Sequence, residues 1–199
     1  MTRLTNAVAP LLAVLPRDGR RYDFHLADEP EPNAFALPGG HVVVTRGLMD
    51  LTDRSEELAA VMAHEIAHVT CRHLFRKVVS SAGPLAVCRL FAGSRGGVLG
   101  LLGASSQLLL VQSFSQEYEL EADAVGWDYL VAAHIDPRAE PAMLRKLEAV
   151  ERELPFGVGP HAFSSHPATE KRIQRLEAKW KTLKDKSGFI QFAETESRH

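Results

Sequence analysis

The pentapeptide HEIAH at residues 64–68 constrains this chain more than any other feature of its sequence. It lies inside a stretch of helical periodicity that runs from residue 55 to about residue 77. Histidines at positions i and i+4 of a helix share one face, so the imidazoles of His64 and His68 can converge on one metal ion. Glu65 lies about 100° around the helix and can reach a water molecule without binding the metal. The pattern predicts a zinc site on a helix, with Glu65 as a general base.

A catalytic zinc site needs a third protein ligand, and an acidic run on a second predicted helix, EYELEAD at residues 117–123, offers one. Glu119 and Asp123 are spaced i, i+4 and therefore face the same side of this helix. One carboxylate can bind zinc while the other accepts a hydrogen bond from a zinc-binding histidine and fixes its tautomer. Glu117 and Glu121 form a competing pair with the same spacing. We expect one Zn²⁺ per chain, held by the two histidines and one carboxylate.

The rest of the chain predicts a mainly helical α+β domain with a small sheet near its N-terminus. The β-leaning runs are residues 22–26, 34–37 and 41–45. Pro38-Gly39-Gly40 between the last two indicates a hairpin. Helical periodicity is found at residues 7–15, 55–77, 114–133, 137–153 and 167–183. We expect a single domain over residues 1–183, followed by a polar C-terminal tail at residues 184–199.

Charge and apolar content limit the possible partners. The chain has 23 Lys and Arg against 25 Asp and Glu, so it lacks the basic excess that nucleic-acid binding requires. Residues 96–111 form an uncharged, largely apolar run that ends before Gln112 and is shorter than the roughly 20 residues that span a bilayer. The N-terminal residues make a poor signal peptide, because Pro10 interrupts their apolar patch. Residues 80–111, apolar and rich in Gly and Ser, fit a lid, a membrane patch or core helices.

Taken together, these motifs resemble the HtpX, CAAX prenyl protease and Oma/BepA group of peptidase family M48, zinc metalloendopeptidases of the gluzincin type. The resemblance starts from HEIAH followed by ELEADAVG at residues 119–126. Further matching segments are NAFALPGGH (33–41), VTRGL (44–48), ELAAV (57–61), DPR (136–138) and SHPAT (165–169). The resemblance implies a zincin-type metallopeptidase domain that hydrolyses peptide bonds of proteins.

The resemblance also implies roles for individual residues. It makes Glu119 the third zinc ligand and places Asp123 behind His64. His166 of the SHPAT segment is then a switch that occupies the fourth zinc position and keeps the enzyme latent, or a transition-state contact. Arg172 stabilises the oxyanion or pairs with an acid. His73 falls off the zinc-facing side of a continuous helix, so we expect it at the surface.

By the same resemblance, an extended substrate peptide lies along a sheet edge formed by Asn33, Ala34, Phe35 and Ala36. Main-chain pairing of this kind tolerates many sequences. The expected partners are therefore protein or peptide substrates, with no nucleic acid, while the oligomeric state stays open.

The sequence thus predicts a zinc metalloendopeptidase of the EC 3.4.24 class. The alternative is a zinc-stabilised, catalytically weak binding or chaperone-like module at a membrane or envelope complex, although Glu65 is not needed in a purely structural zinc site. A third reading is a membrane-surface module that uses residues 99–111. The resemblance implies the bacterial cell envelope, in the periplasm or associated with a membrane. The lack of a recognisable signal peptide or transmembrane segment leaves a cytoplasmic location open.

Overall fold

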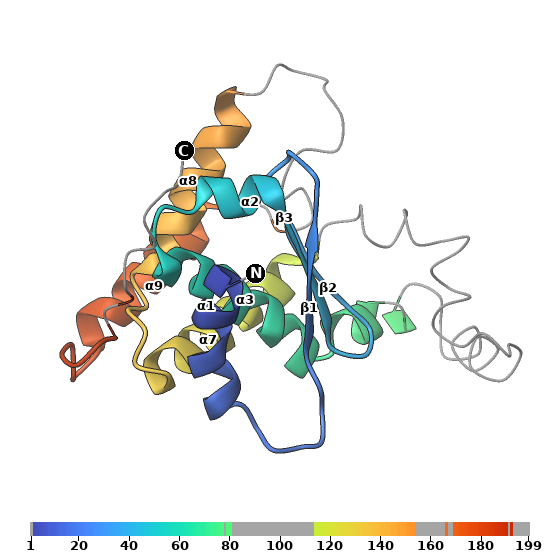
Figure 1. Ribbon diagram of the computed structural model, residues 1–199. Helices are drawn as coiled ribbons and strands as arrows, with labels where there is room; N and C mark the ends of the chain where they lie inside the picture. The colour runs from blue at the N-terminus through green and yellow to red at the C-terminus, as the bar shows by residue number, and fades with distance from the viewer. Residues whose placement is uncertain are drawn as a thin grey trace, which may run out of the picture.

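The computed structural model describes residues 2–77, 79–80, 114–153, 166, 169–190 and 192, so the question of a lid, membrane patch or core over residues 80–111 falls almost wholly outside it. The elements in chain order are α1 (Thr2–Val14), β1 (Asp23–Ala27), β2 (Ala34–Leu37), β3 (His41–Thr45), α2 (Arg46–Leu51), α3 (Ser55–Thr70), α7 (Gln116–Ala132), α8 (Ala139–Glu153) and α9 (Glu170–Thr182). This mainly helical α+β architecture confirms the predicted fold class (Figure 1).

The three strands form one sheet in the order β1-β3-β2. β2 and β3 pair antiparallel, which confirms the hairpin, whereas β1 pairs parallel with β3. Gly40 has φ +89°, and a Cβ at this position would lie 2.0 Å from the carbonyl oxygen of Arg21, so the turn requires glycine. β2 is thus an edge strand of the described sheet, and it packs against α3.

Helix α3 lies at the centre of the molecule, in contact with α1, α7, α8 and β2 (Figure 1). Its apolar side chains Leu58, Met62 and Ile66 are fully buried. The Glu57 carboxylate accepts hydrogen bonds from the backbone amides of Asp53 and Arg54, which satisfies donors at the start of the helix. The HEIAH segment therefore lies on a helix that is held on several sides.

Helix α3 ends earlier than the sequence predicts. We expected it to run to about residue 77, but it stops at Thr70. A turn follows at Cys71 and Arg72, and Arg72 adopts a left-handed backbone with φ +56°. Residues 73–77 are helical again. The break redirects the chain, with consequences for His73 that are described below.

Helix α9 packs against both α7 and α8, and α8 packs against α3. A small apolar cluster joins α7, α8 and α9 through Trp127, Leu144, Ile173 and Leu176. After α9 the chain runs back along the body, because the Ile190 amide donates to the His134 carbonyl at 2.7 Å and Phe192 packs against the main core. Across the described parts of the chain, no helix is both long and apolar enough to cross a membrane.

Gly126 lets α7 approach the backbone of α3. A Cβ at this position would lie 3.2 Å from the His64 nitrogen and 3.3 Å from the Ala63 carbonyl carbon and oxygen. We expect Gly126→Val to lower the free energy of unfolding by about 1–3 kcal/mol, because its branched side chain overpacks this contact. Denaturant unfolding would measure the loss. Ala124→Val, at a half-buried position of the same helix, controls for helix propensity, and an equal loss in both variants would contradict the prediction.

Candidate metal centre

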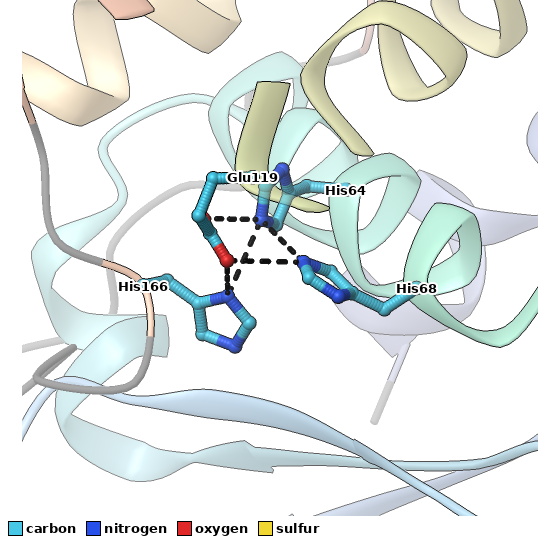
Figure 2. A group of neighbouring side chains, drawn as sticks. All are labelled: His64, His68, Glu119 and His166. Carbon is cyan, nitrogen blue, oxygen red and sulfur yellow. Dashed lines mark hydrogen bonds and ion pairs between the residues drawn. The ribbon is translucent and has the colours of Figure 1, made fainter. Parts of the chain in front are cut away.

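Helix α3 places His64 and His68 one turn apart, with both side chains buried. Their Nε2 atoms lie 3.0 Å apart, and the ring centroids are separated by 4.7 Å. This is the shared helix face that the i, i+4 spacing predicts. The two imidazoles converge on one point at the inner surface of the helix (Figure 2).

Helix α7 brings Glu119 to the same point from a segment about 50 residues further along the chain (Figure 2). Its carboxylate oxygens lie 3.4 Å from the Nε2 atom of His64 and 3.5 Å from that of His68. Ser115 caps the helix by accepting a hydrogen bond from the Tyr118 amide. Of the two carboxylate pairs that the spacing left open, the pair with Glu119 faces the histidines, whereas Glu117 is exposed.

His166 completes the group from outside the two helices (Figure 2). Its Nδ1 atom lies 2.9 Å from a Glu119 oxygen and 3.4 Å from the Nε2 atom of His64. Its Nε2 atom lies 3.7 Å from a carboxylate oxygen of Glu65. The residue is 4% exposed, so the structure places it inside the site rather than on a surface loop.

Three imidazole nitrogens and a carboxylate form a donor set that fits zinc. Ligands at about 2.0–2.1 Å in a tetrahedron around zinc lie roughly 3.3 Å from one another. The distances given above between neighbouring atoms of His64, His68, Glu119 and His166 range from 2.9 to 3.5 Å. Asp123 engages the Nδ1 atom of His64, so the neutral, metal-binding form of this ring would direct its Nε2 lone pair at the centre. Such a convergence of acceptors is stabilised by a cation at their centre.

Asp123 and Arg172 support the site from behind. An Asp123 oxygen lies 3.1 Å from the Nδ1 atom of His64. The Arg172 guanidinium binds Asp123 with two hydrogen bonds of 2.6 and 2.8 Å, and its Nη1 atom lies 2.8 Å from Glu119. Of the two roles considered for Arg172, the structure shows the pairing with acids. All three side chains are buried, so these charges depend on one another.

Hydrogen bonds and ion pairs in the site favour the charged forms of His64 and Asp123. Burial opposes a charge on His64, but hydrogen bonds to Asp123 and Glu119 outweigh it and raise the pKa of His64 to about 10. Burial likewise opposes ionisation of Asp123, yet the hydrogen bonds from Arg172 and His64 lower its pKa. The carboxylates are therefore ionised and ready to hold a cation.

Glu65 is 1% exposed and lies beside the histidines rather than among them. Burial raises the pKa of Glu65, while the positive charges of His166 and His64 and the backbone amide of Ala36 oppose this shift. Within the described residues its Oε2 atom has no hydrogen-bond partner. The Ala36 contact also places the edge strand β2, which includes three of the four expected substrate-edge residues, next to this carboxylate.

The expectation of a surface position for His73 is wrong, because this side chain is 0% exposed. Its Nδ1 atom lies 3.0 Å from the Nδ1 atom of His68, and its Nε2 atom lies 3.2 Å from an oxygen of Glu121. A position five residues after His68 would point away in a continuous helix. The break at Cys71 and Arg72 returns it to the site, and no glycine or proline in the sequence marks that break.

Glu140 on α8 is a second buried group that the sequence did not single out. It is 4% exposed and lies close to His64 and Asp123. Burial, followed by the charge of Asp123, raises the pKa of Glu140 well above its ordinary value. Neither of its carboxylate oxygens has a hydrogen-bond partner among the described residues. It lies on the same face of α8 as Met143, Leu144 and Leu147, which could have indicated its burial.

Comparison with known proteins shows the family to which this chain belongs. The profile of peptidase family M48 matches residues 2–180. The mitochondrial metalloendopeptidase OMA1 of Schizosaccharomyces pombe is 33% identical over 171 residues, which cover 84% of this chain and 49% of the relative. The beta-barrel assembly-enhancing protease of Yersinia pestis is 36% identical over 163 residues, or 76% of this chain and 33% of the relative. The metalloprotease LoiP of Escherichia coli is 33% identical over 165 residues, or 80% of this chain and 63% of the relative.

The chain therefore spans between a third and two thirds of the length of these curated relatives. The matched region includes both helices that form the candidate metal centre, and it extends from the first helix almost to the end of α9. On these grounds the chain belongs to peptidase family M48.

Proposed function

We propose that this chain is a zinc-dependent metalloendopeptidase that hydrolyses peptide bonds of protein substrates. The observation that carries the proposal is the convergence of His64, His68 and Glu119 on one point, with the carboxylate of Glu65 beside it. Three protein ligands of this kind next to a free carboxylate are the donor pattern of catalytic rather than structural zinc sites. The names of the relatives, metalloendopeptidase and protease, agree with this assignment.

In the proposed reaction, His64, His68 and Glu119 would hold a zinc ion, whose chemistry would be to polarise a water molecule and lower its pKa. Glu65 accepts the proton of that water as the peptide carbonyl is attacked, and then passes it to the leaving amine. Asp123 holds His64 in the tautomer that presents its Nε2 lone pair. Arg172 keeps Asp123 and Glu119 ionised in a buried environment.

An extended substrate would pair with the edge strand β2, at Ala34, Phe35 and Ala36, with Asn33 just before it. The strand pairs with β3 on one side, and it packs against α3, which carries Glu65. Pairing along this edge would bring the scissile carbonyl close to the base, because the Ala36 amide is already near its carboxylate. The relatives' names mention mitochondria and beta-barrel assembly, and we propose an envelope or membrane setting for this chain too.

The proposal is tested by incubating the purified, zinc-loaded chain with casein, with and without a chelator. Cleavage that disappears with the chelator and returns with added zinc is the expected result. The metal content, measured on the same sample, should be one zinc ion per chain. A chain that binds zinc without cleaving casein, even after the substitution of His166 described below, would contradict the proposal.

Glu119 is expected to be essential for metal binding. Glu119→Ala removes the carboxylate ligand and should lower the zinc affinity by at least 10–100-fold. Loss of a residue that only hydrogen-bonds to a ligand already has an effect of that size. Competition with a chromogenic chelator measures this affinity. Glu117→Ala, on an exposed position of the same helix, is the matched control and should bind as tightly as the wild type. Unchanged zinc binding in Glu119→Ala would move the third ligand elsewhere.

His166 is proposed to keep the enzyme latent. Its Nδ1 atom lies within 3.4 Å of both His64 and Glu119, where it occupies the fourth position that a catalytic zinc site leaves open. His166→Ala should therefore raise casein cleavage while zinc stays bound through the other three ligands. A lower rate with zinc retained would instead assign His166 to transition-state contact.

The closed donor set also favours a second function, a zinc-stabilised binding or chaperone-like module. Structural zinc sites have four protein ligands, as His64, His68, Glu119 and His166 provide here. In that case His166→Ala would weaken zinc binding and lower thermal stability without any gain of cleavage. The same variant thus separates the two functions.

A further inference from the structure

His73, which is buried, and Glu121 form a chain of contacts behind His68. The His73 Nδ1 atom lies 3.0 Å from the Nδ1 atom of His68, the nitrogen that faces away from the centre. The other ring nitrogen of His73 lies 3.2 Å from Glu121, whose carboxylate binds Arg76 at 2.7 Å. We propose that His73, itself held by Glu121, is a positioning residue that fixes the tautomer and ring orientation of His68 for metal binding. This inference rests on the proposed zinc site.

The proton positions along this chain of contacts follow from the carboxylate of Glu121, at which the chain ends. Glu121 accepts hydrogen bonds, because its carboxylate forms an ion pair with the Arg76 guanidinium at 2.7 Å. The Nε2 atom of His73 must then donate to Glu121. A neutral His73 consequently presents a lone pair at Nδ1, which can only accept from the Nδ1–H of His68. His68 is left with a lone pair at Nε2, the atom that faces Glu119 and His64.

The arrangement mirrors the support of the other histidine. His64 donates through its Nδ1 atom to Asp123, which is paired with Arg172. For His68 the same task is divided between two residues, and it ends on Glu121, which is also paired with an arginine. Both carboxylates come from α7, so this one helix orients both imidazoles. Partners of this kind raise the basicity of metal ligands and hold their rings in place.

Packing holds His73 in this position. The ring is 0% exposed and stacks on Tyr118, with centroids 4.7 Å apart and an interplanar angle of 8°. The guanidinium of Arg76 lies over the Tyr118 ring of this stack, 4.5 Å from the ring centroid. With one ring nitrogen facing His68 and the other facing Glu121, both polar atoms of the ring have a partner.

A second metal site is the competing interpretation, since Cys71, His73 and Glu121 also lie close together. The contacts argue against it. Both nitrogens of His73 are already engaged, and Arg76 places a positive charge 2.7 Å from the Glu121 carboxylate. A dication would have to displace that arginine, whereas the proposed hydrogen bonds leave every contact in place.

The test compares the zinc affinity of the full chain with that of His73→Phe. Phenylalanine keeps a planar ring against Tyr118 but removes the acceptor for His68. We expect the dissociation constant for zinc to rise about 10–100-fold, as it does when other hydrogen-bond partners of metal ligands are removed. The Tm of the zinc-free protein should stay close to that of the wild type. Cys71→Ala, the adjacent control, should bind zinc as the wild type does.

Glu121→Ala provides an independent variant if His73→Phe does not fold, because Glu121 is 43% exposed and its loss leaves the core intact. It should also weaken zinc binding. Ring ¹⁵N spectra of the zinc-loaded wild type should show a proton on Nδ1 of His68 and on Nε2 of His73. In Glu121→Ala the His73 signals should shift towards a mixture of tautomers, a change that a merely structural role would not produce.

The outcomes separate this inference from the proposed function. A wild type without zinc affinity would refute the function itself. A wild type with one zinc ion, together with His73→Phe and Glu121→Ala variants of unchanged affinity, would leave the function in place and overturn the role of His73. A second zinc ion that is lost in Cys71→Ala would also overturn it, in favour of the competing site.

Discussion

Glu65→Gln is expected to retain zinc and to lose almost all peptidase activity. Glutamine has the same size and can keep the contact with the Ala36 amide, but it cannot accept the proton of an attacking water. General-base catalysis contributes about 10²–10⁴-fold to a rate, so the casein cleavage rate should fall by that factor. Because Glu65 is not among the four converging side chains, the zinc content should not change.

This experiment needs an active reference, since we propose that His166 occupies the fourth zinc position. The substitution is therefore made both in the wild type and in His166→Ala. Glu56→Gln, at a half-buried position of the same helix, serves as the control. This variant should cleave casein at the rate of its parent. Loss of zinc from Glu65→Gln would show that Glu65 is a ligand, and retained cleavage would assign the proton transfer to another group.

The geometry of the candidate metal centre could be predicted where it depends on one helix alone. His64, Glu65 and His68 lie on one helix, so their spacing alone fixes their relative directions. For α7, spacing selected two carboxylate pairs but could not choose between them. That choice depends on which face of α7 packs on α3, and the close approach at Gly126 decides it.

The missed features depend on contacts between distant segments or on irregular backbone. His73 is buried because Arg72 adopts a left-handed conformation, which a non-glycine residue rarely does and no local sequence signal indicated. The parallel pairing of β1 with β3 is likewise a tertiary choice, since strand periodicity does not specify a partner. The hairpin of β2 and β3 could be predicted because its turn is encoded locally by Pro38-Gly39-Gly40.

Arg172→Met is expected to have the largest effect on stability. The guanidinium is 4% exposed and balances the buried carboxylates of Asp123 and Glu119. Removal of one partner from a buried ion pair typically costs about 3–5 kcal/mol. For a chain of this size that corresponds to a loss on the order of 10 °C in Tm. Calorimetry of the zinc-free protein measures it, and Arg172→Lys should fall in between, because lysine keeps the charge but not the two-pronged geometry.

Arg145→Met is the matched control, since Arg145 pairs with Glu177 at the surface, where both side chains are more than 40% exposed. Exposed pairs contribute about 1 kcal/mol or less, so this variant should melt close to the wild type. Equal Tm values for the two methionine variants would contradict the expected role of Arg172. Combining Arg172→Met with Asp123→Asn should recover part of the loss, because no unpaired Asp123 charge then stays buried beside His64. A further loss in the double variant would show instead that the guanidinium stabilises the site by packing rather than by charge.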